Sequence, residues 1–377
     1  MIYFDNAATS FPKPKSTVEE LLRSLDECGN AGRGAHRMAL AASKKIYACR
    51  ERLSLLLGVG APERVIFTQS TTYALNMAIK GLLPRDAHVL LSELDHNATR
   101  RPVHALSLER GITYDTFPVL GLDHNGVLDG IKARLQPHTA AIICTHTSNI
   151  CSLSLPLSAI GRLCREKNLL FIVDAAQSAG HLPIDMQKMG IHALAVPAHK
   201  GLLGVQGCGV LALGKDVLPR PMFEGGSGMQ SLSPTMPDEP PERYEAGTLP
   251  TPAICALSGG ISFLEDYGVE NVKKHLEDLF WAARERLESL CGIEIYQRDH
   301  AGGVLLFNKG DIFPTLLAAQ LDKAGIAVRA GLHCAPLAHR ALGTPSGGAV
   351  RISFGPFNTV KELDRLRSAL QDLPTSP

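Results

Sequence analysis

Short apolar segments alternate with amphipathic segments along most of the chain, and this alternation constrains the fold more than any other feature. Apolar runs of strand length followed by stretches with helical spacing are typical of an α/β protein, in which helices cover a central sheet. We predict strands at Arg64–Thr68, Ala87–Ser92, Thr139–Thr145, Leu169–Asp174, Ala193–Val196 and Gly209–Ala212. We predict helices at Ser16–Asp26, Ala42–Leu57, Thr71–Gly81, Arg101–Arg110, Pro156–Lys167 and Leu182–Met189.

The C-terminal part mixes strands and helices differently and predicts a smaller α+β domain. It follows Glu224–Glu245, a segment rich in Gly, Ser, Pro and acidic residues that predicts a long loop. We predict helices at Thr251–Tyr267, Val272–Leu290, Pro314–Ala324 and Val360–Leu370. The predicted strands are Gly303–Asn308, Ala327–Ala330 and Val350–Ser353, and the domain boundary is expected near residues 250–260.

Composition excludes several classes of function. The 377 residues carry a formal net charge of +1, which does not favour a nucleic acid or an acidic membrane as partner. No run of about 18 apolar residues occurs, and the N-terminus lacks the pattern of a signal peptide, so we expect a cytoplasmic protein without a membrane span. The nine cysteines form no C-x-x-C pair, so no metal site is predicted and most should be buried, free thiols.

Two residues at the ends of predicted strands carry the strongest indication of chemistry. Asp174 ends the apolar run Leu170–Asp174, and Lys200 follows the next strand about 26 residues later. A buried lysine amine is a good nucleophile for an imine, and pyridoxal-phosphate (PLP) sites need such a lysine together with an acid for the pyridine nitrogen. Separately, Asp174 could be a helix cap and Lys200 an exposed loop residue; the pair is more specific than either alone.

Polar residues follow two other predicted strands. Thr68–Thr72 lies between a strand and a helix, where hydroxyls and backbone amides can bind a phosphate; plain Ser/Thr capping is an equal alternative. His96, just past another strand, could stack on a planar cofactor, although a lone histidine is more often structural.

The segment Val328–Pro336 predicts a reactive cysteine. Cys334 lies in a Gly-containing loop beside His333 and near Arg329, and cationic neighbours favour the thiolate form of a cysteine. Arg351 lies inside an apolar strand, where its fork of donors would suit a substrate carboxylate. The alternatives are a buried structural cysteine and an arginine at the edge of a sheet.

At these residues the chain resembles the cysteine desulfurase and selenocysteine lyase group of class V, fold-type I PLP enzymes. The resemblance runs nearly from end to end. It includes Tyr3–Ser10, Gly32–Arg37, Ser148–Asn149, Val173–Ser178, His199–Lys200, Arg243–Thr248, Arg329–Ala335 and Asn358–Thr359. It implies a large domain with a mostly parallel seven-stranded sheet over residues 15–255, and a small α+β domain made of residues 1–14 and 256–377.

The resemblance also implies a role for each site residue. Lys200 would carry the cofactor, Asp174 would bind the pyridine nitrogen, Gln177 the ring hydroxyl, and His96 would stack on the ring. The implied phosphate ligands are Thr71, Thr72 and His199, with Thr248 reaching the phosphate of a second subunit in a homodimer. The implied substrate-binding residues are Asn149, Arg351, His36 and Arg329. Cys334 would take the sulfur as a persulfide and leave alanine.

Two features of the sequence refine this resemblance. The short segment between Arg329 and Arg351 resembles the group with a short catalytic loop, which implies that a sulfur-acceptor protein comes to the pocket. The chain departs from the family where Val196-Pro197-Ala198 lacks a serine hydroxyl for the phosphate, and where Asn97 replaces a second histidine.

We therefore predict a homodimeric, PLP-dependent cysteine desulfurase acting on L-cysteine. The alternatives are a selenocysteine lyase acting on selenocysteine, a class V aminotransferase or β-lyase that does not use Cys334, and a PLP-binding partner subunit with little turnover.

Overall fold

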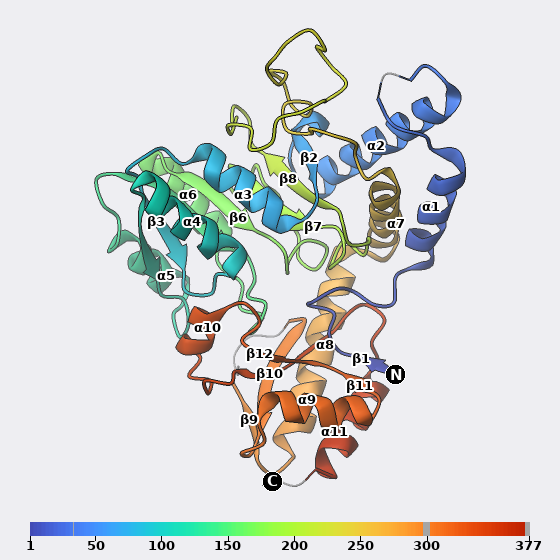
Figure 1. The fold of residues 1–377 in the computed structure, drawn as a ribbon. Coiled ribbons are helices and arrows are strands. Elements are labelled where there is room, and N and C mark those ends of the chain that lie inside the picture. The colour runs from blue at the N-terminus through green and yellow to red at the C-terminus, as the bar shows by residue number, and fades with distance from the viewer. Residues whose placement is uncertain (33, 297–301, 374–377) are drawn as a thin grey trace.

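A seven-stranded sheet forms the centre of the larger part of the molecule (Figure 1). The structure, a computed structural model, describes residues 1–32, 34–296 and 302–373; Arg33, part of a quoted motif, lies outside them. The strand order is β2-β8-β7-β6-β5-β3-β4, and only β8 runs antiparallel to its neighbours. The strands are β2 (Val65–Thr68), β3 (His88–Ser92), β4 (Thr113–Phe117), β5 (Thr139–Thr145), β6 (Leu170–Asp174), β7 (Ala193–Pro197) and β8 (Gly209–Leu213). The predicted α/β class and the mostly parallel sheet are confirmed.

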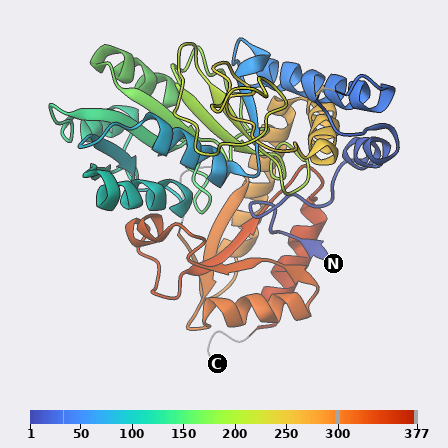
Figure 2. The same ribbon diagram turned by 45° about the horizontal axis from the view of Figure 1, so that its top comes forward.

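Helices cover both faces of this sheet because its central strands are apolar on both sides. In β6, Ile172 packs into one hydrophobic cluster while Phe171 and Val173 pack into the other. One face is covered by α3 (Thr71–Leu82) and α4 (Asn97–Arg110), as Figure 2 also shows. The other face packs against α2 (Arg37–Leu56), α5 (His124–Lys132), α6 (Leu157–Lys167) and α7 (Thr251–Tyr267), and α1 (Lys15–Glu27) packs on α7.

A four-stranded antiparallel sheet, in the order β12-β13-β10-β9, forms the smaller part. Its strands are β9 (Ile293–Ile295), β10 (Val304–Lys309), β12 (Arg329–Gly331) and β13 (Ala349–Ser353). Around it lie α8 (Val269–Glu288), α9 (Pro314–Lys323), α10 (Pro336–Ala341) and α11 (Val360–Gln371). The first strand, β1 (Ile2–Tyr3), pairs with β11 (Ile326–Ala327), so the N-terminus joins this part (Figure 1). We propose that the two domains divide within α7, near residue 255.

The predicted helix at Leu182–Met189 is wrong, because this segment forms turns. It contains Pro183, and its backbone N–H groups at Met186 and Gln187 bond to the carbonyls of Leu57 and Gly58 (2.9 and 3.2 Å) instead of to a helical partner. The elements β1, β4, α5, β9 and α10, and the 3-10 turn at Pro62–Arg64, were not predicted. β4 is an edge strand with exposed polar residues, so it lacks the apolar run of its neighbours.

Candidate active site

A cavity of about 120 Å³ lies at the carboxyl ends of the parallel strands. Asp174 and Thr145 end β6 and β5, Lys200 follows β7 and His96 follows β3, so the strand directions bring these residues together. Eight of the predicted site residues line this one cavity: Thr71, Thr72, His96, Asn149, Asp174, Gln177, His199 and Lys200. Ser70, Ala98, Thr145, Ala176 and Pro197 complete its lining.

Lys200 and Asp174 both line this cavity, and the charge of each shifts the pKa of the other. Burial lowers the pKa of the Lys200 amine to about 8, while the charge of Asp174 opposes that shift and those of Arg351 and Arg329 add to it. Burial also raises the pKa of the Asp174 carboxyl, although a hydrogen bond from the Ala176 N–H (2.9 Å) and the charge of Lys200 oppose it. Each group is therefore shifted toward its neutral form when the two are alone in the pocket.

The start of α3 provides an anion-binding end. Ser70 caps this helix through its side-chain oxygen, which accepts from the Tyr73 N–H (3.4 Å). The hydroxyl of Thr71 and the Nδ1 atom of His199 are both buried, and neither has a hydrogen-bond partner in the described part of the chain. Burying a polar atom without a hydrogen-bond partner costs free energy. A phosphate bound at this end of the cavity would give both the Thr71 hydroxyl and His199 Nδ1 a partner. Pro197 also lines the cavity and offers no N–H donor, as the departure in the sequence predicted.

His96 presents a neutral ring to the cavity. Its Nδ1 atom accepts from the Ala98 N–H (3.0 Å) as the cap of α4, so the ring proton lies on Nε2. Burial lowers its pKa to about 4, and the charge of Lys200 adds to this effect. His96 thus has a structural role as a helix cap and also lines the cavity.

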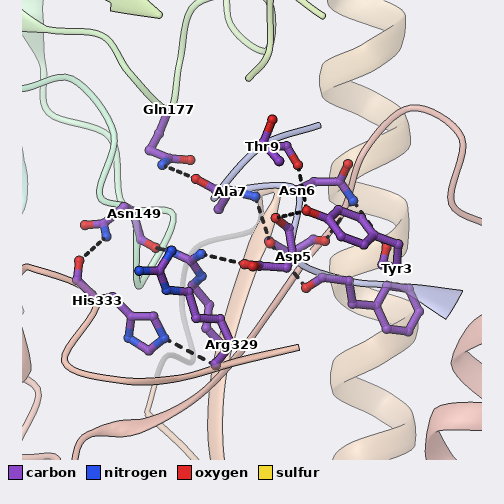
Figure 3. A network of polar contacts seen from close by, with 12 residues as sticks. Tyr3, Asp5, Asn6, Ala7, Thr9, Asn149, Gln177, Arg329 and His333 are labelled. Atoms are coloured by element: carbon purple, nitrogen blue, oxygen red, sulfur yellow. Dashed lines mark hydrogen bonds and ion pairs between the residues drawn. The ribbon is translucent and has the colours of Figure 1, made fainter. Parts of the chain in front are cut away.

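The substrate-side residues Asn149 and Arg329 lie close to His333 and Asp5 (Figure 3). Arg351 donates from Nη1 to the Asn149 carbonyl (3.1 Å) and from Nη2 to the carboxylate of Asp5 (2.9 Å). Its Nε atom is buried without a partner among the described residues. Arg329, which faces solvent in β12, pairs across the sheet with Arg351, so two guanidinium groups lie on one side of the pocket. Neither arginine lines the cavity itself.

Cys334 is exposed on a short loop that is held against the larger domain. The Asn97 N–H donates to the Cys334 carbonyl (2.8 Å), and the Asn149 amide donates to the His333 carbonyl (2.9 Å). His333 and Cys334 both have left-handed backbones, with φ of 47° and 55°. Non-glycine residues in this region cost free energy, and such strain clusters at functional sites. The hydrogen bonds from the larger domain keep the loop in this shape.

The predicted role of His333 as a cationic neighbour is wrong. Burial lowers its pKa to about 3, so its ring is neutral, and its ring nitrogens bond to His339 (3.1 Å) and to the Arg329 carbonyl (3.3 Å). His333 therefore braces the loop. The expectation that most cysteines are buried is confirmed for six of the nine, whereas Cys291 and Cys334 are exposed and Cys28 is partly buried.

Two predicted site residues lie away from this cavity. His36 is exposed and caps α2, where its Nδ1 atom accepts from the Ala39 N–H (3.4 Å). Thr248 is exposed on the loop that precedes α7. Neighbouring residues of both segments, Gly32 and Gly247 among them, line a second cavity of about 370 Å³. One chain therefore does not bring these two residues to its own Lys200.

The sequence indicated no role for two charged residues that hold this site together. Asp5 pairs with Arg351, and Lys13 donates to the His199 carbonyl (2.9 Å) next to Lys200. Both belong to the N-terminal segment, in which Asp5 is one residue of the Tyr3–Ser10 motif. A local pattern could not relate Asp5 to a partner 346 residues away.

The chain is similar to known proteins over nearly its whole length. The family model described as aminotransferase class-V matches residues 2–366. A probable cysteine desulfurase of Aeropyrum pernix is 33% identical over 100% of this chain and 95% of its own length. A probable cysteine desulfurase of Methanothermobacter thermautotrophicus is 32% identical over 99% of this chain and 94% of its own length. The solved apo structure of a cysteine desulfurase from Thermococcus onnurineus superposes with a TM-score of 0.90 at 29% identity, covering 98% of this chain and 94% of that one.

Proposed function

Because the chain belongs to the class-V aminotransferase family, we propose that it is a PLP-dependent cysteine desulfurase that converts L-cysteine to L-alanine and takes the sulfur onto Cys334. Apart from family membership, the arrangement of the site residues supports this proposal. Lys200 and Asp174 share a cavity, and the loop of Cys334 is docked at Asn97 and Asn149, beside His96 and on the cavity wall.

The residues present fit PLP. We assign its aldehyde to Lys200, its pyridine nitrogen to Asp174 and its ring hydroxyl to Gln177, with His96 against the ring. The unpartnered Thr71 hydroxyl and His199 Nδ1 would hold its phosphate, together with Thr72. When bound, PLP supplies an electron sink that lets the carbon–sulfur bond of cysteine break with its electron pair on the carbon.

The chain's own residues perform the rest of the reaction. Arg351 and Asn149 orient the carboxylate of the amino acid, with Arg329 as a further substrate ligand. The Cys334 thiolate attacks the substrate sulfur, so a sulfur–sulfur bond forms as the carbon–sulfur bond breaks. The carbon then takes a proton. One cysteine and one thiol thus give one alanine and one persulfide, and no external oxidant is needed.

Mass spectrometry of the enzyme after incubation with L-cysteine tests this proposal. We expect added sulfur on the Cys334 peptide, and neither persulfide nor alanine from Cys334→Ala. Cys291→Ala is the matched control, because Cys291 is the other exposed cysteine. Borohydride should fix the cofactor to the Lys200 peptide. Alanine formation by Cys334→Ala from selenocysteine alone would favour a selenocysteine lyase, and formation from cysteine at the wild-type rate would favour a lyase that does not use Cys334.

We also propose that the enzyme acts as a cytoplasmic homodimer and passes its sulfur to an acceptor protein. His36 and Thr248 are exposed and lie away from their own cavity, which suits a contribution to the site of a second copy. No helix in the described ranges is long and apolar enough to cross a membrane. The hydrogen bonds on the Cys334 loop favour an acceptor that comes to the pocket. Sedimentation should give a dimer at micromolar concentration, and an active monomer would contradict this arrangement.

A further inference from the structure

The N-terminal segment of residues 3–13, which we call the strap, runs between the two parts of the molecule and beside the active site (Figures 1 and 3). Its Ala7 carbonyl accepts from the Gln177 amide (3.1 Å), and its Ser10 N–H donates to the His199 carbonyl (3.0 Å). On the other side, Asp5 forms the ion pair with Arg351. The strap therefore places a carboxylate at the residue assigned to the substrate's carboxylate.

Asp5 uses only part of what Arg351 offers. Arginine can hold a carboxylate with two parallel N–H bonds, and Nε and Nη2 form one such fork on the same side of the guanidinium group. Asp5 takes Nη2, while Nε is buried and has no partner in the part of the chain that the structure describes. Since Nη1 is bonded to the Asn149 carbonyl, the fork of Nε and Nη2 is the one that remains for a ligand.

We propose that Asp5 is an internal placeholder, a carboxylate that occupies Arg351 when no substrate is bound and is displaced by the carboxylate of the amino acid. This inference rests on the proposed function, because it takes the substrate to be an α-amino acid. It makes Asp5 a specificity-determining residue, since only a ligand with its own anionic group can replace Asp5 without leaving a buried cation unpaired.

The difference in burial between Arg351 and Asp5 favours displacement of Asp5 by the ligand over simultaneous binding of both carboxylates to Arg351. The Arg351 side chain is 3% exposed, so it needs a counter-charge, whereas the Asp5 side chain is 21% exposed and can turn toward water. Two carboxylates on one fork would repel each other beside a guanidinium group that is itself buried.

The backbone of Asp5 does not need to move. The Tyr3 hydroxyl lies 3.2 Å from the Asp5 carbonyl and 3.0 Å from the Thr9 carbonyl, and on either side of Asp5 the backbone bonds to Ser353. The Tyr3 contacts fix the shape of the strap and the Ser353 bonds hold it on the smaller domain, so displacement is a rotation of the Asp5 side chain.

Binding of the reaction product to the PLP-loaded enzyme tests the placeholder without turnover. L-Alanine carries the carboxylate, and ethylamine is the same molecule without it. If Asp5 occupies Arg351 about nine-tenths of the time, its removal raises apparent affinity about tenfold. We expect Asp5→Asn to bind L-alanine about that much more tightly by calorimetry, and to bind ethylamine as the wild type does.

Tyr3→Phe is the matched control, because it removes a hydroxyl that braces the strap and leaves all charges in place. It should bind both ligands as the wild type does. Equal or weaker binding of L-alanine by Asp5→Asn would overturn the proposal, and so would the same tightening in Tyr3→Phe.

A second measurement needs no variant and stands even if Asp5→Asn fails to fold. In a crystal structure of the wild-type enzyme with L-alanine bound, the Asp5 carboxylate should lie beyond hydrogen-bond distance of Arg351, with the alanine carboxylate on Nε and Nη2. An intact ion pair in that complex would overturn the proposal. The proposed function fails separately, if L-cysteine gives no alanine.

Discussion

Lys200 should react as a neutral amine near pH 8. Burial lowers its pKa from the ordinary 10.5 to about 8. At any pH below both values, this shift enlarges the fraction of neutral amine by roughly 300-fold, because each pKa unit is a factor of ten. Since only the neutral amine attacks an aldehyde, the structure predicts that the apoenzyme takes up PLP rapidly at neutral pH.

The assay follows an amine-selective acylating reagent on the apoenzyme between pH 6 and 11, with peptide mass spectrometry to separate the lysines. Lysine is cationic below its pKa, so labelling of Lys200 should rise with pH and reach half its maximum near pH 8. Lys188 is the internal control, because its exposed side chain bonds to Asp185 and its pKa is raised above 10.5. Its labelling should rise only at higher pH.

The charges around Lys200 give the sign of two further shifts. Asp174 stabilises the ammonium form, so Asp174→Asn should lower the midpoint for Lys200. Arg329 opposes the ammonium form, so Arg329→Gln should raise it. A wild-type midpoint near that of Lys188, or shifts of the opposite sign in these variants, would refute the reasoning.

Three further substitutions test the framework around the site. Glu245→Gln leaves Arg50, its buried partner, unpaired and should lower the free energy of unfolding by about 3 kcal/mol in urea denaturation; an unchanged midpoint would contradict this. In Gly348→Ala, the added methyl group would lie 2.2 Å from the Gly331 carbonyl oxygen, at a φ of 78°. Because Gly331 leads into the loop of Cys334, sulfur transfer should fall in an alanine-formation assay while PLP absorbance persists. Thr71→Val removes the unpartnered hydroxyl and should weaken PLP binding about tenfold in equilibrium dialysis; unchanged affinity would exclude the hydroxyl as a ligand.

The sequence predicted the parts of the fold whose burial is uniform along an element. Strands such as Thr139–Thr145 are buried along most of their length and read as unbroken apolar runs. The edge strand Thr113–Phe117 was missed because its alternate residues are exposed and polar. The spacing of Leu182–Met189 predicts a helix where the structure has turns, because the tertiary hydrogen bonds that replace helical ones leave no trace in local spacing.

The candidate site, like the fold, could be predicted from the sequence only in part. Asp174 and Lys200 could be predicted because each follows a strand of one parallel sheet, and parallel strands end at a common edge. The pairing of Asp5 with Arg351 could not, because it joins the strap to the smaller domain across almost the whole chain. His36 and Thr248 were grouped with this site by resemblance, and their distance from the cavity follows from tertiary structure that local sequence does not encode.

The ionisable groups in and beside this cavity explain why the site suits ligands that carry charged groups. Burial shifts the cavity groups toward their neutral forms: it lowers the pKa of Lys200, His96 and His199 and raises that of Asp174. Beside the cavity, the buried charge of Arg351 is balanced by Asp5.

A buried carboxyl with a raised pKa becomes a stable anion once a cation is placed against it. Asp174 should therefore ionise against a protonated pyridine nitrogen, and a carboxylate likewise stabilises the buried charge of Arg351. The same low-polarity pocket that holds these groups neutral when they are alone strengthens each ion pair when its partner arrives. This favours PLP and an α-amino acid together. PLP supplies a cation for Asp174, and the amino acid supplies a carboxylate for Arg351 in place of the displaceable Asp5.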